Sequence, residues 1–374
     1  MTKITDIPAI RFKGFSDTWE QRKFEEIAVR SSVICSDDTL PRVEYEDIVS
    51  GTGRLNKDIY AKQSSKSGIA FHQGDVLYGK LRPYLQNWLL PTFDGLAVGD
   101  FWVLQPQNAD SSFLYRLIQS RQFDEVANQW TGTKMPRADW KLVSKTVFSI
   151  PSNISEQAAI GTYFTALDSL ITLHQRKYDK LTNVKKSMLE KMFPQNGSNV
   201  PEIRFKGFTE AWEQRKLGDI VDVRSGKDYK HLSDGNIPVY GTGGYMLSVN
   251  QALSYDEDAI GIGRKGTIDK PYILKAPFWT VDTLFYAIPR EKVDLNFAFD
   301  VFQNIDWKKK DESTGVPSLS KTAINEIDVL VPQYDEQQSL GQFFYRIDHL
   351  ITLHQRELEK LKNLKKACLE KMFV

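Results

Sequence analysis

The chain carries two copies of the same pair of sequence blocks, and this duplication limits what it can fold into. Residues 8–27 and 201–220 are identical at 13 of 20 aligned positions, at an offset of 193 residues. Residues 155–193 and 335–373 are identical at 22 of 39 positions, at an offset of 180. Two copies with so long a period do not suit a solenoid, which stacks many short repeats. The duplication therefore predicts two related halves with pseudo-twofold symmetry.

The longer blocks have the hydrophobic pattern of a long coiled-coil helix. Their apolar residues follow one another in alternating steps of four and three, the a/d spacing of a heptad repeat, over about five heptads. At 1.5 Å per residue, each helix would be roughly 55–60 Å long. The predicted seam consists of Phe164, Leu167, Ile171 and His174 in the first copy, and of Phe344, Ile347, Ile351 and His354 in the second.

The partner of each helix is a separate question. A coiled coil with another chain is one interpretation. Polar residues interrupt both seams at matching positions, namely His174 and His354 and then Lys185 and Lys365, which favours pairing within the chain. Because a folded segment separates the two helices, an antiparallel pair is the natural arrangement. It would hold the two globular segments at opposite ends.

The repeated blocks divide the chain into five segments. We expect a first globular domain over residues 1–154, a first helix over 155–193 and a linker over 194–200, followed by a second globular domain over 201–334 and a second helix over 335–374. Short strand-like runs that end in turns predict mixed α/β (α+β) structure for both domains. The expected fold is two globular α/β domains joined by two long antiparallel coiled-coil helices.

Composition narrows the classes of function. Among 374 residues, 49 Lys+Arg stand against 48 Asp+Glu, so a nucleic-acid surface would have to come from local clustering of positive charge. Two cysteines and five histidines argue against a disulfide framework or a Cys/His metal site, and they fit a reducing cytosol. No apolar run is long enough to cross a membrane and no secretory signal is present, so we expect a cytoplasmic protein without membrane contact.

Recognisable catalytic motifs are lacking. Residues 261–266 match G-x-G-x-x-G literally, but turn and strand residues with a proline follow them, where a dinucleotide site needs a helix. There is no Walker A sequence, no nucleophile elbow, no amino-methyltransferase motif and no convincing nuclease cluster of carboxylates and lysine. We therefore expect no catalytic residue, metal or cofactor in this chain.

Basic residues mixed with glycine, threonine and tyrosine recur in the same order in both globular segments. Glycine lets a backbone approach phosphate, Lys and Arg bind phosphates or guanine edges, and hydroxyl groups contact either. Each stretch alone can be an ordinary loop, but the recurrence favours a nucleic-acid surface. The candidate DNA-binding residues are Tyr78, Lys80, Arg82, Tyr84, Thr133 and Lys134 in the first half, and Tyr240, Gly241, Thr242, Arg264, Lys265, Ser313 and Thr314 in the second.

The doubled architecture and its motifs together resemble the specificity subunits of type I restriction–modification systems. The resemblance extends over essentially the whole chain. It rests on the repeated blocks at 10–23 and 203–216, on the segments 77–84, 237–241, 263–266 and 280–286, and on the two helices that contain Ile-Thr-Leu-His-Gln-Arg at 171–176 and 351–356.

This resemblance implies two target recognition domains, each of which reads one half of a bipartite, asymmetric target in double-stranded DNA. It implies helices that set the spacer and bind two modification subunits, which carry S-adenosylmethionine and methylate adenine. Restriction subunits with ATP and Mg would join them, and this chain would be non-catalytic. Two alternatives stay open at this point: a DNA-free coiled-coil scaffold, and a nuclease or methyltransferase that reads DNA by itself.

Overall fold

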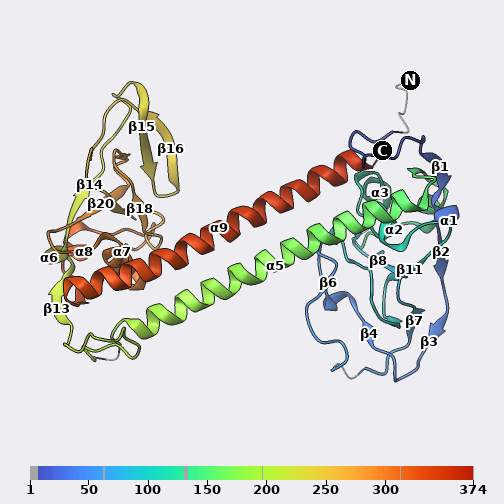
Figure 1. Ribbon diagram of the computed structural model, residues 1–374, viewed down its shortest axis with the longest axis horizontal. Helices are drawn as coiled ribbons and strands as arrows, with labels where there is room; N and C mark the ends of the chain where they lie inside the picture. The colour runs from blue at the N-terminus through green and yellow to red at the C-terminus, as the bar shows by residue number, and fades with distance from the viewer. Residues whose placement is uncertain (1–6, 62–63, 130–133, 196, 312, 374) are drawn as a thin grey trace. The chain divides into compact units, whose positions relative to one another are not determined.

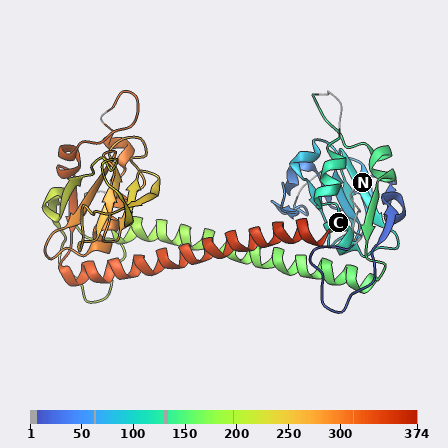
Figure 2. The same cartoon turned by 90° about the horizontal axis from the view of Figure 1, so that it is seen from above.

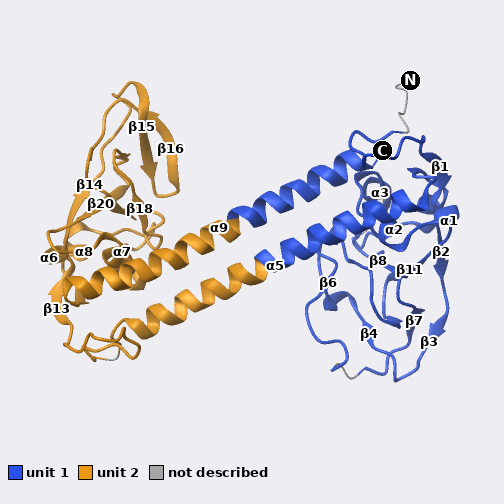
Figure 3. Ribbon diagram, viewed as in Figure 1, with its two compact units in different colours: residues 1–174, 356–374 blue, residues 175–355 orange. Residues whose placement is uncertain are grey.

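The computed structural model divides the chain into two compact units (Figure 3). Unit 1 comprises residues 1–174 and 356–374, and unit 2 comprises residues 175–355. The described residues are 7–61, 64–129, 134–195, 197–311 and 313–373. Two long helices, α5 (Ile154–Met192) and α9 (Tyr334–Met372), each begin in one unit and end in the other. Each unit therefore contains the start of one long helix and the end of the other.

The globular part of unit 1 consists of short strands and short helices. In chain order they are β1 (Glu20–Lys23), α1 (Phe24–Ile27), β2 (Ala28–Ser31), β3 (Ile34–Cys35), β4 (Arg42–Val43), η1 (Tyr45–Asp47), β5 (Ile48–Val49), β6 (Arg54–Leu55), β7 (Gly68–Phe71), β8 (Val76–Gly79), η2 (Pro83–Leu85), β9 (Trp88–Leu89), β10 (Gly95–Ala97), β11 (Phe101–Pro106), α2 (Ser111–Leu117), α3 (Arg121–Ala127), α4 (Trp140–Lys145) and β12 (Val147–Ile150). They form two four-stranded sheets, β2-β11-β8-β9 and β3-β7-β10-β4, and two small pairs, β1-β12 and β5-β6.

The globular part of unit 2 repeats this plan with its own elements (Figure 1). In chain order they are β13 (Glu213–Lys216), α6 (Leu217–Ile220), β14 (Val221–Ser225), β15 (Asp234–Gly241), β16 (Gly244–Val249), β17 (Ala259–Gly263), β18 (Tyr272–Leu274), β19 (Trp279–Thr280), β20 (Leu284–Pro289), α7 (Leu295–Asn304), η3 (Trp307–Lys310), α8 (Lys321–Asn325) and β21 (Asp328–Val331). The sheet β14-β20-β17-β18 matches β2-β11-β8-β9 strand for strand, and β13-β21 matches β1-β12. The mixed α/β fold with two long helices is confirmed.

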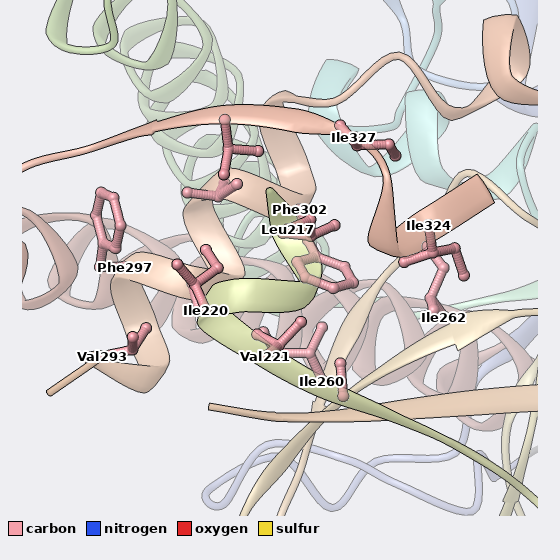
Figure 4. Packing of buried hydrophobic residues seen from close by; sticks show 14 of the residues in the cluster. Leu217, Ile220, Val221, Ile260, Ile262, Val293, Phe297, Phe302, Ile324 and Ile327 are labelled. Carbon is pink, nitrogen blue, oxygen red and sulfur yellow. The ribbon is translucent and has the colours of Figure 1, made fainter. Parts of the chain in front are cut away.

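A single apolar core ties the long helices to the globular part of each unit. In unit 2, Leu217, Ile220 and Val221 pack with the buried face of α7, whose buried positions 297, 298, 301 and 302 have helical spacing (Figure 4). Leu340 and Phe344 of α9 belong to this same core. The core of unit 1 includes the corresponding residues of α5. Neither globular part thus completes its core without the helices.

A buried ion pair fixes the first turn of each long helix. Arg11 donates two hydrogen bonds to Glu156 at 2.6 and 2.7 Å, and Arg204 donates two to Glu336, both at 2.7 Å. Glu156 and Glu336 are 1% and 2% exposed. A buried carboxylate needs such a partner, because water no longer solvates its charge. The Arg of each short repeated block thus pairs with the Glu of a long one.

The glutamine that follows each of these glutamates adds a second link. Gln157 accepts from the backbone N–H of Asp110 and donates to the carbonyl of Pro151, both at 2.8 Å. Gln337 makes the same two bonds, to Asp294 and Pro332. Asp110 and Asp294 are the N-caps of α2 and α7. The start of each long helix is therefore tied to the start of a helix in the globular part.

In each unit, the start of one long helix lies antiparallel beside the end of the other (Figure 2). In unit 1, Lys365 near the end of α9 pairs with Asp168 of α5 at 2.7 Å. In unit 2, the equivalent Lys185 of α5 pairs with Asp348 of α9. None of the predicted seam residues is fully exposed: Phe164, Leu167, Phe344 and Ile347 are buried, and Ile171, His174, Ile351 and His354 are half-buried.

The short blocks also contact the ends of the long helices. The backbone N–H of Ile10 donates to the carbonyl of Lys371 at 3.1 Å in unit 1, and that of Ile203 donates to Lys191 at 2.9 Å in unit 2. The last carbonyls of a helix lack partners within the helix, so these bonds satisfy them. Each short block thus contacts the start of one long helix and the end of the other long helix.

In unit 1, a buried arginine of the globular part forms an ion pair with the long helix α5. Arg116, the sixth residue after the N-cap of α2, is 3% exposed and donates to Asp168 at 2.7 Å. Asp168 thus sits between Arg116 and Lys365. Burial lowers the pKa of Lys365, against the opposing effect of Asp168. One carboxylate serves two cations here.

In unit 2, an acid occupies the corresponding place. Asp300, the sixth residue after the N-cap of α7, is 1% exposed. Burial raises the pKa of Asp300 well above its usual value. The charge of Lys185 opposes this rise, and that of Asp348 adds to it. The helix pair thus presents both an Asp and a Lys in each unit, beside the buried Arg116 in unit 1 and beside the buried Asp300 in unit 2, whose Oδ2 has no hydrogen-bond partner among the described residues.

We predict that Glu336→Ala destabilises unit 2 by about 3–5 kcal/mol, because it leaves the Arg204 guanidinium charged and poorly solvated. Glu202→Ala removes an exposed ion pair with Lys191 from the same region and should cost about 1 kcal/mol or less. Urea denaturation measures the stability of both variants, and hydrogen exchange shows in which unit the stability is lost. Equal stability of the two variants would contradict the anchoring role of Glu336.

Candidate nucleic-acid interface

The candidate site of each unit begins where a central strand of its sheet ends. Strand β8 ends at Gly79 and is followed by Lys80, while β17 ends at Gly263 and is followed by Arg264. The backbone N–H of Lys80 donates to Asp100 at 2.9 Å, and that of Arg264 donates to Thr283 at 2.8 Å. Lys80 and Arg264 are therefore structurally equivalent.

A second segment pairs with this loop in both units. Leu81 forms an antiparallel bridge with Arg137, and Lys265 forms the same bridge with Ser318. The next N–H donates to a proline carbonyl in each case, Arg82 to Pro136 at 2.7 Å and Gly266 to Pro317 at 2.8 Å. The stretches of basic and polar residues at 78–84 and 134–136, and those at 263–267 and 313–317, thus lie side by side.

The loop needs a left-handed residue directly after this bridge. Arg82 has φ of 49°, and the equivalent Gly266 has φ of 91°. Glycine adopts such angles without strain, whereas arginine does so at a cost. Pro83 follows Arg82 and begins η2, which fixes the next turn. The same backbone path thus carries an arginine side chain in unit 1 and none in unit 2.

A third segment completes the site. A Cβ added to Gly263 would lie 3.3 Å from the methyl group of Thr242, so the turn at 241–244 lies against the end of β17. In unit 1, a Cβ on Gly79 would lie 2.8 Å from the hydroxyl of Tyr45. Strand β15 pairs with β19 in unit 2 as β4 pairs with β10 in unit 1, and Tyr240 and Val43 hold equivalent positions in these parallel pairs. Thr242 and Tyr45, each two residues further along the chain, are therefore counterparts.

Unit 2 therefore brings its predicted residues together from three segments. Arg264, Lys265 and Thr314 are exposed, Tyr240, Thr242 and Ser313 are half-buried, and Gly241 is buried. The carbonyl of Gly241 accepts from the hydroxyl of Tyr272 at 2.6 Å. In the second segment, Asp311 closes the loop by accepting from the N–H groups of Ser313 and Ser318 at 3.0 and 2.9 Å.

Unit 1 brings together most of its predicted residues. Arg82, Tyr84 and Lys134 are exposed and Lys80 is half-buried. Thr133 lies outside the described residues. The prediction for Tyr78 is wrong, because its side chain is 2% exposed and stacks on Trp102 with 5.5 Å between ring centroids. Tyr78 lies on β8, where alternate side chains point to opposite faces of the sheet, and its side points into the core.

The two sites differ in how their cations are paired. Asp100 accepts from Arg137 at 3.0 Å and lies 3.4 Å from Lys80. Partial burial raises the pKa of Asp100, but Arg137 and Lys80 together outweigh this, and the net pKa is lowered. Among the residues that the structure describes in unit 2, no carboxylate pairs with Arg264, which lies over the ring of Phe285 at 5.8 Å.

Three residues of the unit 1 site were missed from the sequence: Tyr45, Asp100 and Arg137. The Tyr45 hydroxyl donates to the carbonyl of Asp100 and accepts from the N–H of Leu81, both at 2.8 Å. Burial raises the pKa of Tyr45 well above its usual value, so the hydroxyl keeps its proton for this bond. The only sequence signal for Arg137 is that it directly follows the predicted stretch that contains Lys134 and ends at Pro136.

Two other kinds of feature are absent from the described part of the chain. There, no group of three or more His, Cys, Asp or Glu side chains is placed to hold a metal ion. In the same residues, no helix is long and apolar enough to cross a membrane.

Comparisons with known proteins agree with this architecture. The family model described as the type I restriction modification DNA specificity domain matches residues 209–363. The specificity subunit of type I restriction enzyme MjaVIII from Methanocaldococcus jannaschii is 23% identical over 335 residues, covering 75% of this chain and 77% of the relative. That of EcoDI from Escherichia coli is 25% identical over 187 residues, covering 47% of this chain and only 42% of the relative.

Solved structures share the fold at low sequence identity. The crystal structure of the S subunit of a type I restriction–modification system from M. genitalium has a TM-score of 0.74 and 16% identity, and the match covers 98% of this chain and 99% of that one. A structure from work on complex assembly in a type I restriction–modification system has a TM-score of 0.51 and 16% identity, with 94% and 96% covered. The resemblance found in the sequence is confirmed: in sequence and in fold, the chain is similar to the specificity subunits of type I restriction–modification systems.

Proposed function

We propose that this chain is the DNA-specificity subunit of a type I restriction–modification complex, in which each unit reads one half of a bipartite target. The observation that carries the proposal is that both units hold the same three-segment loop arrangement at the end of the same strand. On nearly identical backbone hydrogen bonds, one unit presents Lys80, Arg82 and Arg137, and the other presents Arg264 and Lys265. A DNA-free scaffold would have no use for this recurrence.

Unlike side chains on a common backbone suit an asymmetric target. Lys and Arg read guanine in the major groove, whereas hydroxyl groups are less selective. The left-handed position carries Arg82 in unit 1 and Gly266 in unit 2, so the two loops present different groups at the same place. We infer that the two half-sites differ in sequence.

The long helices would set the spacer and bind two modification subunits. Leu170 and Leu173 of α5 are 44% and 45% exposed, and the equivalent Leu350 and Leu353 of α9 are 42% and 45% exposed. At about 100° per residue, Leu170 and Leu173 lie roughly 200° and 140° around the helix from Asp168, which faces the globular part. Such exposed leucines on an outer helix face suit a protein partner.

In this proposal the partners do the chemistry. The modification subunits would bind S-adenosylmethionine and methylate adenine, and restriction subunits with ATP and Mg would cut unmodified DNA. The chain itself would have no catalytic role and would act in the cytoplasm. Because partner subunits add their own phosphate contacts, a net charge of +1 is compatible with DNA binding.

We predict that Arg264→Ala weakens specific DNA binding by about 1–3 kcal/mol, or about 5- to 150-fold, and relaxes one base position if the side chain reads guanine. If it contacts only phosphate, binding weakens uniformly across sequences. The measurement is selection from a random DNA library with the complex of this chain and its modification subunit, followed by binding titrations.

Lys275→Ala is the matched control, because Lys275 pairs with Asp258 next to the start of β17, whereas Arg264 follows its end. This variant should bind and select DNA as the unmodified chain does. Unchanged affinity and unchanged specificity in Arg264→Ala would refute the assignment of this loop.

We also predict that the double variant Leu170→Asp, Leu173→Asp loses binding to the modification subunit, because it places two charges on the proposed docking face. Leu142→Asp changes an equally hydrophobic but only 37% exposed leucine outside the long helices and should bind normally. Analytical ultracentrifugation with thermal melting separates lost binding from lost folding. A folded double variant that still binds the subunit would show that the docking face lies elsewhere.

A further inference from the structure

Asp100 lies in the candidate interface of unit 1, between the side chains of Lys80 and Arg137. Its Oδ2 accepts from the Arg137 guanidinium at 3.0 and 3.3 Å, and its Oδ1 lies 3.4 Å from the Lys80 ammonium. Its backbone carbonyl accepts from the N–H of Lys80 and from the hydroxyl of Tyr45. One residue thus orients two cations and the strand end that carries one of them.

Unit 2 lacks this carboxylate. Thr283 takes the place of Asp100, since its carbonyl accepts from the N–H of Arg264 just as that of Asp100 accepts from Lys80. The Arg264 guanidinium contacts the carbonyl of Asp282 at 3.5 Å and the ring of Phe285. Within the described residues, Lys265 also has no carboxylate within ion-pair distance.

We propose that Asp100 is a positioning residue that sets the specificity of the first half-site: it holds Lys80 and Arg137 toward the bases and withholds them from non-specific phosphate contacts. The proposal rests on the DNA-reading function of unit 1. Unit 2, with Thr283, uses free cations and therefore gains more of its affinity from phosphate.

The carboxylate of Asp100 changes how the two cations beside it interact with DNA. The charges of Lys80, Arg137 and Asp100 sum to +1. The Asp100 carboxylate repels phosphate, so cations that stay paired with it contribute less to phosphate binding than free cations do. Each phosphate neutralised by a free cation steepens the dependence of log K on log salt by about 0.9. Base contacts by preoriented Arg or Lys add discrimination instead.

The variant that tests this proposal, Asp100→Asn, is expected to fold. Lys80, Asp100 and Arg137 are 31%, 29% and 51% exposed, and ion pairs this open add little to stability. A change in DNA binding by Asp100→Asn would therefore report on the interface rather than on folding, and the thermal melting temperature checks this.

The experiment uses the complex with the modification subunit and measures binding between about 50 and 200 mM salt. The probes are target DNA and DNA with either half-site scrambled. The half-site that Arg264→Ala affects is assigned to unit 2. Asp94→Asn is the matched control, since Asp94 pairs with His72 close to the start of β8, whereas Lys80 follows its end.

Asp100→Asn should steepen the salt dependence by about one to two. It should also lower discrimination at the first half-site by about five- to tenfold and leave the second half-site and the Asp94→Asn control unchanged. The reciprocal variant Thr283→Asp, which introduces the missing carboxylate, should make the salt dependence shallower by about one.

An unchanged salt dependence and unchanged discrimination in Asp100→Asn would overturn the proposal. If that variant melts early, Thr283→Asp decides, because no change in its salt dependence has the same consequence. Failure of the unmodified complex to bind DNA would instead overturn the proposed function, so the two failures are distinguishable.

Discussion

The buried pairing of an arginine with the first-turn glutamate of each long helix is the interaction on which the architecture depends. It joins a short repeated block to a long one, as Arg11 with Glu156 and as Arg204 with Glu336. Because the same short block also contacts the end of the other long helix, each unit is closed by segments far apart in sequence. Breaking such a pair leaves a buried charge, so the blocks are more constrained than the segments between them.

This scaffold explains how two unlike globular parts share one chain. The helix pair presents an aspartate and a lysine in each unit, and these meet Arg116 in one unit and Asp300 in the other. The loops vary in the same way: their backbone hydrogen bonds recur while their side chains change. The contacts between the helices and the globular parts can therefore stay the same while the side chains of the two loops differ.

The sequence was informative where structure follows from local periodicity. The heptad pattern predicted both long helices and seam residues that are buried or half-buried, because helical spacing can be counted directly along the chain. The recurrence of glycine and basic residues also pointed to loops that the structure brings together. Tyr45 and Asp100 could not be found in this way, since they reach the site through strand pairing with distant segments. Tyr78 was misassigned because Arg82 nearby is exposed and Lys80 is half-buried, whereas all four residues of β8, Tyr78 among them, are buried.

The most direct test is methylation sequencing of the genome of a host that expresses this chain with its modification subunit, with the gene intact and deleted. Deletion should remove one methylated motif made of two unlike half-sites separated by a spacer of fixed length. A methylation pattern that is identical with and without the expressed gene would contradict the claim that this chain chooses the DNA target.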